Sequence, residues 1–143
     1  NHSHNKIMII GRNNKDIYSY LSTDFKINES KITYLKNKDI QLRYLTAHRS
    51  KGLEETDTII INMSNNLLGF PNQIKDERIL RFVSNKKSKT PFDEERRLFY
   101  VALTRSKNNV YILVPKNNPS VFINELIMNY KSKIEIIKLF PGK

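Results

Sequence analysis

The chain has 143 residues, enough for one domain with a sizeable core, and 25 Lys and Arg against 14 Asp and Glu give a net charge of +11. This charge favours polyanionic partners such as nucleic acid, although a Lys-rich surface can also serve solubility alone. The chain has no cysteine and no apolar run of membrane-spanning length, and we expect no secretory leader. These features exclude disulfides and thiolate metal sites, and we expect a cytoplasmic protein without a membrane anchor.

Short apolar or β-branched runs predict strands in the first half of the chain. The clearest is Lys6–Gly11, an apolar run ended by Gly, as expected of a buried strand. Asn14–Leu21 has a helical spacing of apolar residues, and Asn65–Asn72 is expected to be a loop. Further strands are predicted at Ile32–Leu35, Gln41–Thr46 and Thr58–Ile61.

The strongest helix is predicted at Glu94–Arg105. Asp93 stands at the N-cap position, and acidic residues fill the first turn, where they complement the helix dipole. Residues spaced by three and four positions share one face of this helix: Leu98, Val101, Ala102 and Arg105. The other elements predicted in the second half are a helix at Ile74–Val83, a Lys-rich loop at Asn85–Thr90, a strand at Asn109–Val114, a helix at Ser120–Tyr130 and a last strand at Ile134–Ile137.

Strands that alternate with helices predict an α/β fold with an open, mostly parallel sheet flanked by helices. Ligands of such sheets bind at the carboxyl ends of the strands. Arg12 follows the first strand, Thr46–Glu54 follows the strand at Gln41–Thr46, and Arg105 ends the strongest helix. On one edge of the sheet these groups would form a phosphate site, because guanidinium groups bind phosphate with a forked geometry.

Simpler interpretations stay open when spacing is the only argument. Arg12 could be a solvated surface residue, Arg105 could complement the helix dipole, and His48 could be an ordinary polar side chain. Glu94–Arg97 could be a solvated first turn with local ion pairs. The sequence has no Gly-rich phosphate loop and no acidic pair suited to Mg²⁺. We therefore predict no metal site in the chain, and we expect most of any nucleotide to be bound elsewhere.

Three segments resemble motifs of the UvrD/Rep-type superfamily 1 DNA helicases. Thr46–Glu54, with the sequence TAHRSKGLE, resembles motif V, and Glu94–Arg105, with the sequence EERRLFYVALTR, resembles motif VI. Ile9–Arg12 looks like motif IV. The order and spacing also match, so residues 1–143 are identified as similar to a single second RecA-like domain of P-loop NTPase type.

The resemblance implies a fragment of a longer motor, as the absence of an initial Met also indicates. In this family ATP lies between two RecA-like domains, and ATP and Mg²⁺ are bound mainly by a first motor domain that carries the phosphate loop. The position of Arg105 in motif VI implies an arginine finger, with Arg12 as a second contact to the γ-phosphate. Glu54 is the implied ribose contact, and Gly52 would allow close approach of the backbone to the nucleotide.

The resemblance further implies that the motor binds single-stranded DNA and moves along it from 3′ to 5′. Thr46, His48 and Lys51 are the implied DNA contacts, although Lys51 would suit either polyanion. The other implied partner is the N-terminal motor domain of the same chain. Two alternative functions stay open: the same motor could remodel RNA polymerase, or the domain could be a non-catalytic nucleic-acid-binding module.

Two features depart from the common family pattern. Glu55 stands where the family carries an aromatic residue after motif V, so contacts that depend on that ring are not expected. The gap between Arg12 and Thr46 is too short for the accessory subdomain that many relatives insert there. Together with the segment Gly69–Pro71, this gap makes the chain look closest to the helicase IV branch.

Overall fold

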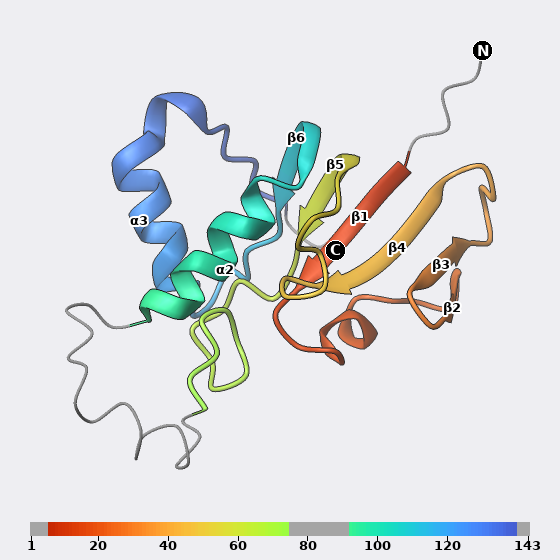
Figure 1. The fold of residues 1–143 in the computed structure, drawn as a ribbon, viewed down its shortest axis with the longest axis horizontal. Helices are drawn as coiled ribbons and strands as arrows, with labels where there is room; N and C mark the ends of the chain where they lie inside the picture. The colour runs from red at the N-terminus through yellow and green to blue at the C-terminus, as the bar shows by residue number, and fades with distance from the viewer. Residues whose placement is uncertain (1–5, 75–91, 140–143) are drawn as a thin grey trace.

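The structure is a computed structural model that describes residues 6–74 and 92–139 (Figure 1). Its elements follow one another along the chain as β1 (Lys6–Gly11), η1 (Asp16–Ser19), β2 (Phe25–Asn28), β3 (Lys31–Tyr34), β4 (Gln41–Thr46), β5 (Glu55–Ile60), α2 (Asp93–Leu103), β6 (Ser106–Ile112), α3 (Val121–Tyr130) and η2 (Lys131–Lys133).

Six strands form one mixed sheet in the order β2-β3-β4-β1-β5-β6. Four neighbouring strands run parallel, in the order β4, β1, β5 and β6. β2 and β3 form an antiparallel hairpin that extends the sheet beyond β4. β1 lies in the middle and is apolar on both faces, as a parallel strand covered on both sides requires. The predicted mostly parallel α/β sheet is confirmed.

The main core lies between one face of the sheet and the helices α2 and α3 (Figure 1). Met8, Ile10 and Ile60 project from β1 and β5 toward the helices and are fully buried. Three aromatic rings close this core from the helix side and from the loop after β5. Phe99 stacks on Phe122 with ring centres 5.5 Å apart, and Phe70 meets both rings edge to face.

Arg96 links the two helices at the rim of this core. Its Nη2 lies 2.7 Å from Oε1 of Glu125 on α3, and its guanidinium carbon lies 5.4 Å from the ring centre of Phe122. The hydrogen bond from Arg96 lowers the pKa of Glu125. The charged first turn of α2 therefore also packs between helices, which goes beyond the simpler interpretation of Glu94–Arg97 as a solvated first turn with local ion pairs.

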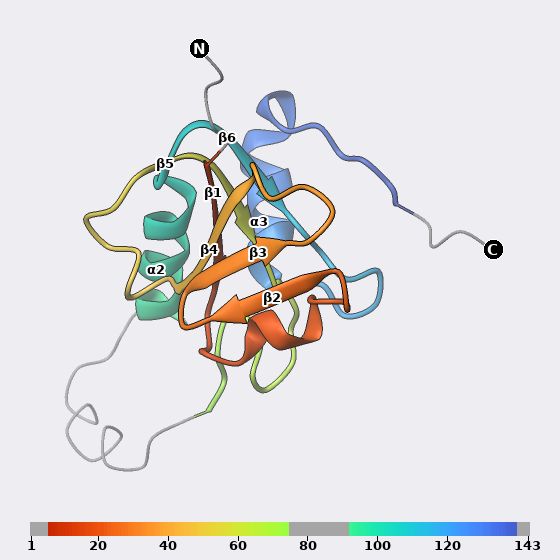
Figure 2. The same ribbon diagram turned by 90° about the vertical axis from the view of Figure 1, so that its right-hand side faces the viewer.

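A smaller core covers part of the opposite face of the sheet. Ile17 of η1 packs with Ile32, Tyr44 and Ile61, and the β2–β3 hairpin lies beside η1 (Figure 2). This cluster ends short of the outer strand β6. Four apolar side chains of β6 and the segment after it stay more than a third exposed: Val110, Tyr111, Leu113 and Val114.

Several local predictions differ from the structure. The helix expected at Asn14–Leu21 is a single 3₁₀ turn, and the strand Phe25–Asn28 was not predicted. The predicted strand at Ile134–Ile137 is wrong, because no strand among the described residues pairs with it. Ile136 and Ile137 are exposed instead, at 61% and 68%.

The predicted N-cap of the strongest helix is also wrong by one residue. Phe92 is the N-cap, with a left-handed φ of 66°, and its carbonyl oxygen accepts the backbone N–H of Arg96. Asp93 is already helical, and its carboxylate contacts the guanidinium of Arg96 at 3.3 Å. The helix predicted at Ile74–Val83 and the loop at Asn85–Thr90 lie outside the described residues, apart from Ile74.

No helix in the described ranges is long and apolar enough to cross a membrane.

Candidate functional site

The turn after β1 lies at the carboxyl edge of the sheet and is tightly packed. A Cβ on Gly11 would lie 2.2 Å from the hydroxyl oxygen of Tyr44, so a larger residue there would displace the Tyr44 side chain. One carboxylate oxygen of Asp16 accepts the backbone N–H groups of Arg12 and Asn13, each at 3.0 Å. Burial, and then the charge of Asp16, raise the pKa of the Tyr44 phenol, which stays protonated and donates to the carbonyl of Asn13.

The side chain of Arg12 is bound by a carboxylate on α2. Its Nε lies 2.7 Å from Oε2 of Glu95, and its Nη2 lies 2.7 Å from Oε1 of the same residue. The two side chains are only 20% and 13% exposed. Glu95 also accepts the backbone N–H of Asn72 at 2.9 Å. Arg12 is therefore part of a half-buried ion pair that joins the turn after β1 to the first turn of α2.

The segment Thr46–Glu54 begins at the same carboxyl edge and then leaves it. The hydroxyl of Thr46 accepts the backbone N–H of Arg49, and the buried hydroxyl of Ser50 donates to the carbonyl of Ala47. These bonds fold the first half of the segment into a tight turn. His48 and the residues from Lys51 through Glu54 are exposed.

Gly52 sits in the exposed half of this segment at a φ of +82°, a conformation that other L-residues adopt only with strain. A Cβ at this position would meet no atom within 4 Å, so the space beside it is open. The backbone conformation alone thus explains the glycine, and the open space leaves room for a ligand to approach the backbone.

Replacing Gly52 by alanine is expected to lower the free energy of unfolding by about 1–2 kcal/mol, because alanine must adopt the left-handed conformation. Asparagine tolerates this conformation better, so Gly52→Asn should cost less. Urea unfolding of the two variants measures the difference. Equal stability of wild type and Gly52→Ala would show that φ is not positive at this position.

Arg105 lies at the opposite edge of the sheet from Arg12. Its backbone carbonyl accepts the N–H of Glu55 at the start of β5, and its Nη1 donates to the carbonyl of Leu53 at 3.2 Å. Its Nε donates to the carbonyl of Val101 in the last turn of α2. Arg105 therefore lies beside the end of the Thr46–Glu54 segment, where it contacts Leu53, the residue before Glu54.

The prediction that Arg12, Thr46–Glu54 and Arg105 gather on one edge of the sheet is wrong. α2 contacts Arg12 through its first turn and leads into β6 after its last turn, so it runs antiparallel to the strands. Its 11 residues separate the two arginines by roughly 15 Å along the helix axis. Thr46 and Arg12 mark the carboxyl edge, whereas Gly52, Glu54 and Arg105 lie toward the amino edge.

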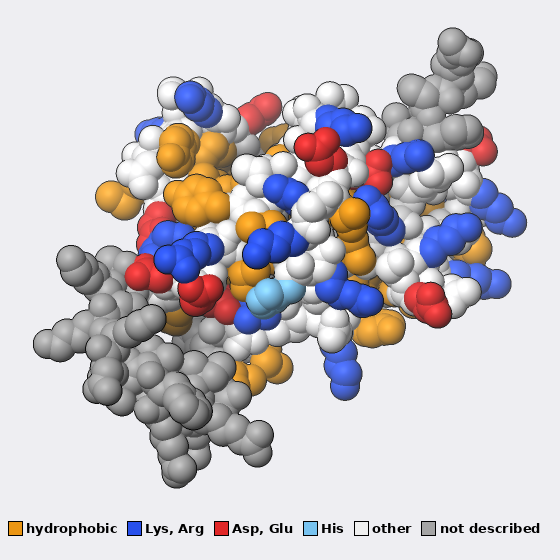
Figure 3. Space-filling model, in the orientation of Figure 1, with side chains coloured by type: hydrophobic (Ala, Val, Ile, Leu, Met, Phe, Trp, Pro, Cys, Tyr) orange, Lys and Arg blue, Asp and Glu red, His pale blue; other side chains and the backbone are white. Residues whose placement is uncertain are grey.

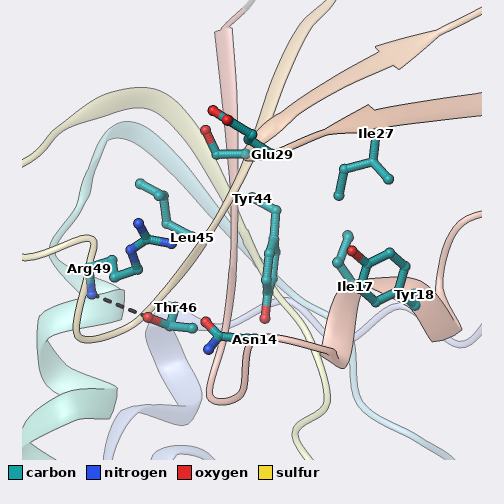
Figure 4. A pocket seen from close by; sticks show the side chains of 10 residues that line it. Asn14, Ile17, Tyr18, Ile27, Glu29, Tyr44, Leu45, Thr46 and Arg49 are labelled. Carbon is teal, nitrogen blue, oxygen red and sulfur yellow. Dashed lines mark hydrogen bonds between the residues drawn. The ribbon is translucent and has the colours of Figure 1, made fainter.

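A cleft of about 510 Å³ opens beside the carboxyl ends of β1 and β4 (Figure 4). Thr46 and Arg49 form one side of it, and Tyr18 of η1 lies on the other side. Tyr18 is 62% exposed and Arg49 is also exposed. Figure 3 shows Lys and Arg side chains spread over the face of the molecule that carries α2 and β4. The cleft thus offers an aromatic face, a hydroxyl and a guanidinium, and the carboxylate of Glu29 also lines it.

Sequence reasoning missed the contributions of Glu95, Asp16 and Asn72. Each acts through partners that are far apart in the chain, such as Glu95 with Arg12, 83 positions away. The only signal was the presence of acidic residues within motif VI and directly after motif IV, and both have ordinary surface explanations. Among residues 6–74 and 92–139, no group of three or more His, Cys, Asp or Glu is arranged to hold a metal ion.

Comparison with known proteins identifies the class to which this fold and these segments belong. The family model of the UvrD-like helicase C-terminal domain matches residues 15–117, well over half of the chain, so the chain belongs to this family. The resemblance inferred from the motifs is thereby confirmed, and membership implies a RecA-like fold for the mixed sheet. The matched range contains Thr46–Glu54 and Glu94–Arg105 but begins after Arg12.

Individual relatives are DNA helicases. The chain is 38% identical to DNA helicase IV of Escherichia coli over 94 residues, which cover 63% of this chain and 13% of the relative. It is 30% identical to the ATP-dependent DNA helicase Rep of Buchnera aphidicola over 133 residues, covering 83% of this chain and 18% of the relative. The chain therefore spans less than a fifth of the length of these relatives, and the part that it covers is a UvrD-like helicase C-terminal domain.

Proposed function

We propose that this domain is the second motor domain of an ATP-dependent DNA translocase that moves 3′ to 5′. The observation that carries the proposal is the position of Arg105 beside the exposed end of the Thr46–Glu54 segment. Backbone carbonyls hold the guanidinium of Arg105 near the exposed carboxylate of Glu54 and the unoccupied space beside Gly52. This arrangement suits a nucleotide that is bound mainly by another domain. The first motor domain would supply the phosphate loop and the Mg²⁺ site.

The amino edge fits the phosphate and ribose groups of ATP. Two backbone carbonyls hold the guanidinium of Arg105 in place, and the side chain is only partly buried. A positioned guanidinium stabilises the charge that develops when the γ-phosphoryl group is transferred to water. The exposed carboxylate of Glu54 can accept hydrogen bonds from ribose hydroxyls, and the open space at Gly52 admits the nucleotide. ATP with its Mg²⁺, when bound, supplies the phosphoanhydride that is cleaved.

The carboxyl edge fits single-stranded DNA. The hydroxyl of Thr46 accepts the N–H of Arg49 and can still donate its own hydrogen to a phosphate oxygen. His48 and Lys51 are exposed in the same segment, and the adjoining cleft presents Tyr18 as a face on which a base can stack. The segment thus starts at the proposed DNA contact and ends at the proposed nucleotide contact.

ATP hydrolysis by the full-length protein tests the proposal. Single-stranded DNA is expected to raise the hydrolysis rate strongly, whereas residues 1–143 alone should hydrolyse almost no ATP because the phosphate loop is absent. If single-stranded DNA left the hydrolysis rate of the full-length protein unchanged, the motor function would be refuted. A stoichiometric complex with RNA polymerase together with absent unwinding would favour the polymerase-remodelling alternative.

A further inference from the structure

The guanidinium group of Arg12 binds the carboxylate of Glu95 through two of its nitrogens. Both Nε and Nη2 donate to Glu95, with the closest contact of each at 2.7 Å. The remaining exposure of the two side chains is low, at 20% and 13%. A forked arginine–carboxylate pair of this kind is among the stronger polar contacts in proteins. The charge of Arg12 is therefore already neutralised within the domain.

Glu95 joins three segments at this point. Its Oε2 accepts the backbone N–H of Asn72 at 2.9 Å, and the amide nitrogen of the Asn72 side chain donates to the side chain of Asn13 at 2.8 Å. Asn13 and Arg12 belong to the turn after β1, Asn72 to the loop after β5, and Glu95 to α2. The carboxylate also lies in the first turn of α2, where it complements the helix dipole.

α2 connects this network to Arg105 at the other edge of the sheet. The helix is packed on the sheet through Phe99 and Ala102, which are 3% and 0% exposed. Arg105 follows its last turn and is tied to the carbonyl of Val101 in that turn. Because a packed helix moves as a rigid body, the position of its first turn sets the position of Arg105.

We propose that Arg12 and Glu95 are positioning residues that fix α2 and thereby hold Arg105 beside Glu54, and that Arg12 does not bind the nucleotide phosphates. This inference rests on the proposed motor function, in which Arg105 contacts ATP. It replaces the sequence-based expectation of Arg12 at the γ-phosphate, which required both arginines on one edge.

A double-mutant cycle in the full-length helicase tests the inference, using Arg12→Gln, Glu95→Gln and the variant carrying both. Each single variant should lower the kcat of DNA-stimulated hydrolysis on the order of tenfold to hundredfold, with an unchanged KM for ATP, because Arg105 is misplaced. The double variant should be no slower than the single variants, because both remove the same ion pair.

The alternative role gives a different pattern. If Arg12 bound the γ-phosphate, Arg12→Gln would be far more damaging than Glu95→Gln, and affinity for ATP would fall. That pattern would overturn the inference. The matched control is the exposed pair Glu94–Arg97 on the same helix, whose side chains are 82% and 76% exposed. Arg97→Gln should leave kcat and KM unchanged.

Hydrogen exchange separates failure of this inference from failure of the motor function. The backbone amides of Thr104 and Arg105 bond to the last turn of α2. Both should exchange faster in Arg12→Gln and in Glu95→Gln, but not in Arg97→Gln. Unchanged exchange in the first two variants would overturn the positioning role whatever the hydrolysis assay shows. Absent DNA stimulation in the wild type, with faster exchange in the variants, would refute only the motor function.

Discussion

If the proposed motor function holds, replacing Arg105 by alanine is expected to lower DNA-stimulated ATP hydrolysis of the full-length protein by roughly 10³-fold or more, the effect typical of a lost arginine finger. The reason is electrostatic: the guanidinium held by the carbonyls of Val101 and Leu53 would no longer face the charge that develops on the γ-phosphoryl group. Steady-state hydrolysis with saturating single-stranded DNA measures the loss, and a fluorescent nucleotide measures binding, which should persist.

The matched control is Arg97→Ala. Arg97 lies on the same helix, is 76% exposed and pairs with Glu94, which is 82% exposed, so its loss should barely change turnover. If Arg105→Ala kept the wild-type rate, Arg105 would be a structural residue that satisfies the carbonyls at the end of α2. The proposed nucleotide contacts of Glu54 and Gly52 would then be wrong as well.

Phe122→Ala is expected to lower the free energy of unfolding by about 3–5 kcal/mol, a large part of the stability of a small domain. Phe122 is 1% exposed, stacks on Phe99 and meets Phe70 edge to face, and it also lies under the guanidinium of Arg96. Its removal leaves a cavity at the junction of α2, α3 and the loop after β5, because these rings cannot collapse without moving both helices.

Met128→Ala is the control for this prediction, because Met128 lies on the same helix and is 83% exposed. It should change the free energy of unfolding by less than about 0.5 kcal/mol. Urea unfolding of both variants gives the comparison. Similar small losses in the two variants would mean that α3 does not close the core as described.

The elements predicted well were those whose pattern is local. The apolar run of β1 and the acidic start and apolar face of α2 specify their structures without help from distant residues. Phe25–Asn28 was missed because its four residues become a strand only by pairing with Lys31–Tyr34. Ile134–Ile137 has apolar residues suited to a strand, but it pairs with neither edge strand of the described sheet, β2 or β6.

The layout of the candidate site could not be predicted from the sequence. The motif resemblance proposes Thr46–Glu54 and Arg105 as site residues, because each motif is contiguous in sequence. The separation of Arg12 from Arg105 follows from the topology. Arg12 follows β1 at the carboxyl edge, whereas Arg105 lies between α2 and the parallel strand β6 and therefore at the amino edge. The expectation of a single edge did not take this into account. The bond between Arg12 and Glu95 was beyond sequence reasoning, because nothing local to either residue selects the other.

The length of the segment between β4 and β5 has a mechanical consequence. Thr46 is level with Gly11 on β1, whereas Asp57 is level with Ile7, so the eight residues from Ala47 to Glu54 must travel roughly 20 Å back along the sheet and cross β1. Fully extended they reach at most roughly 28 Å, and two hydrogen-bonded turns, from Thr46 to Ser50 and from Ser50 to Leu53, shorten that reach. Because these two turns store chain length, we expect a displacement of Thr46 to reach Glu54 only while both turns stay closed.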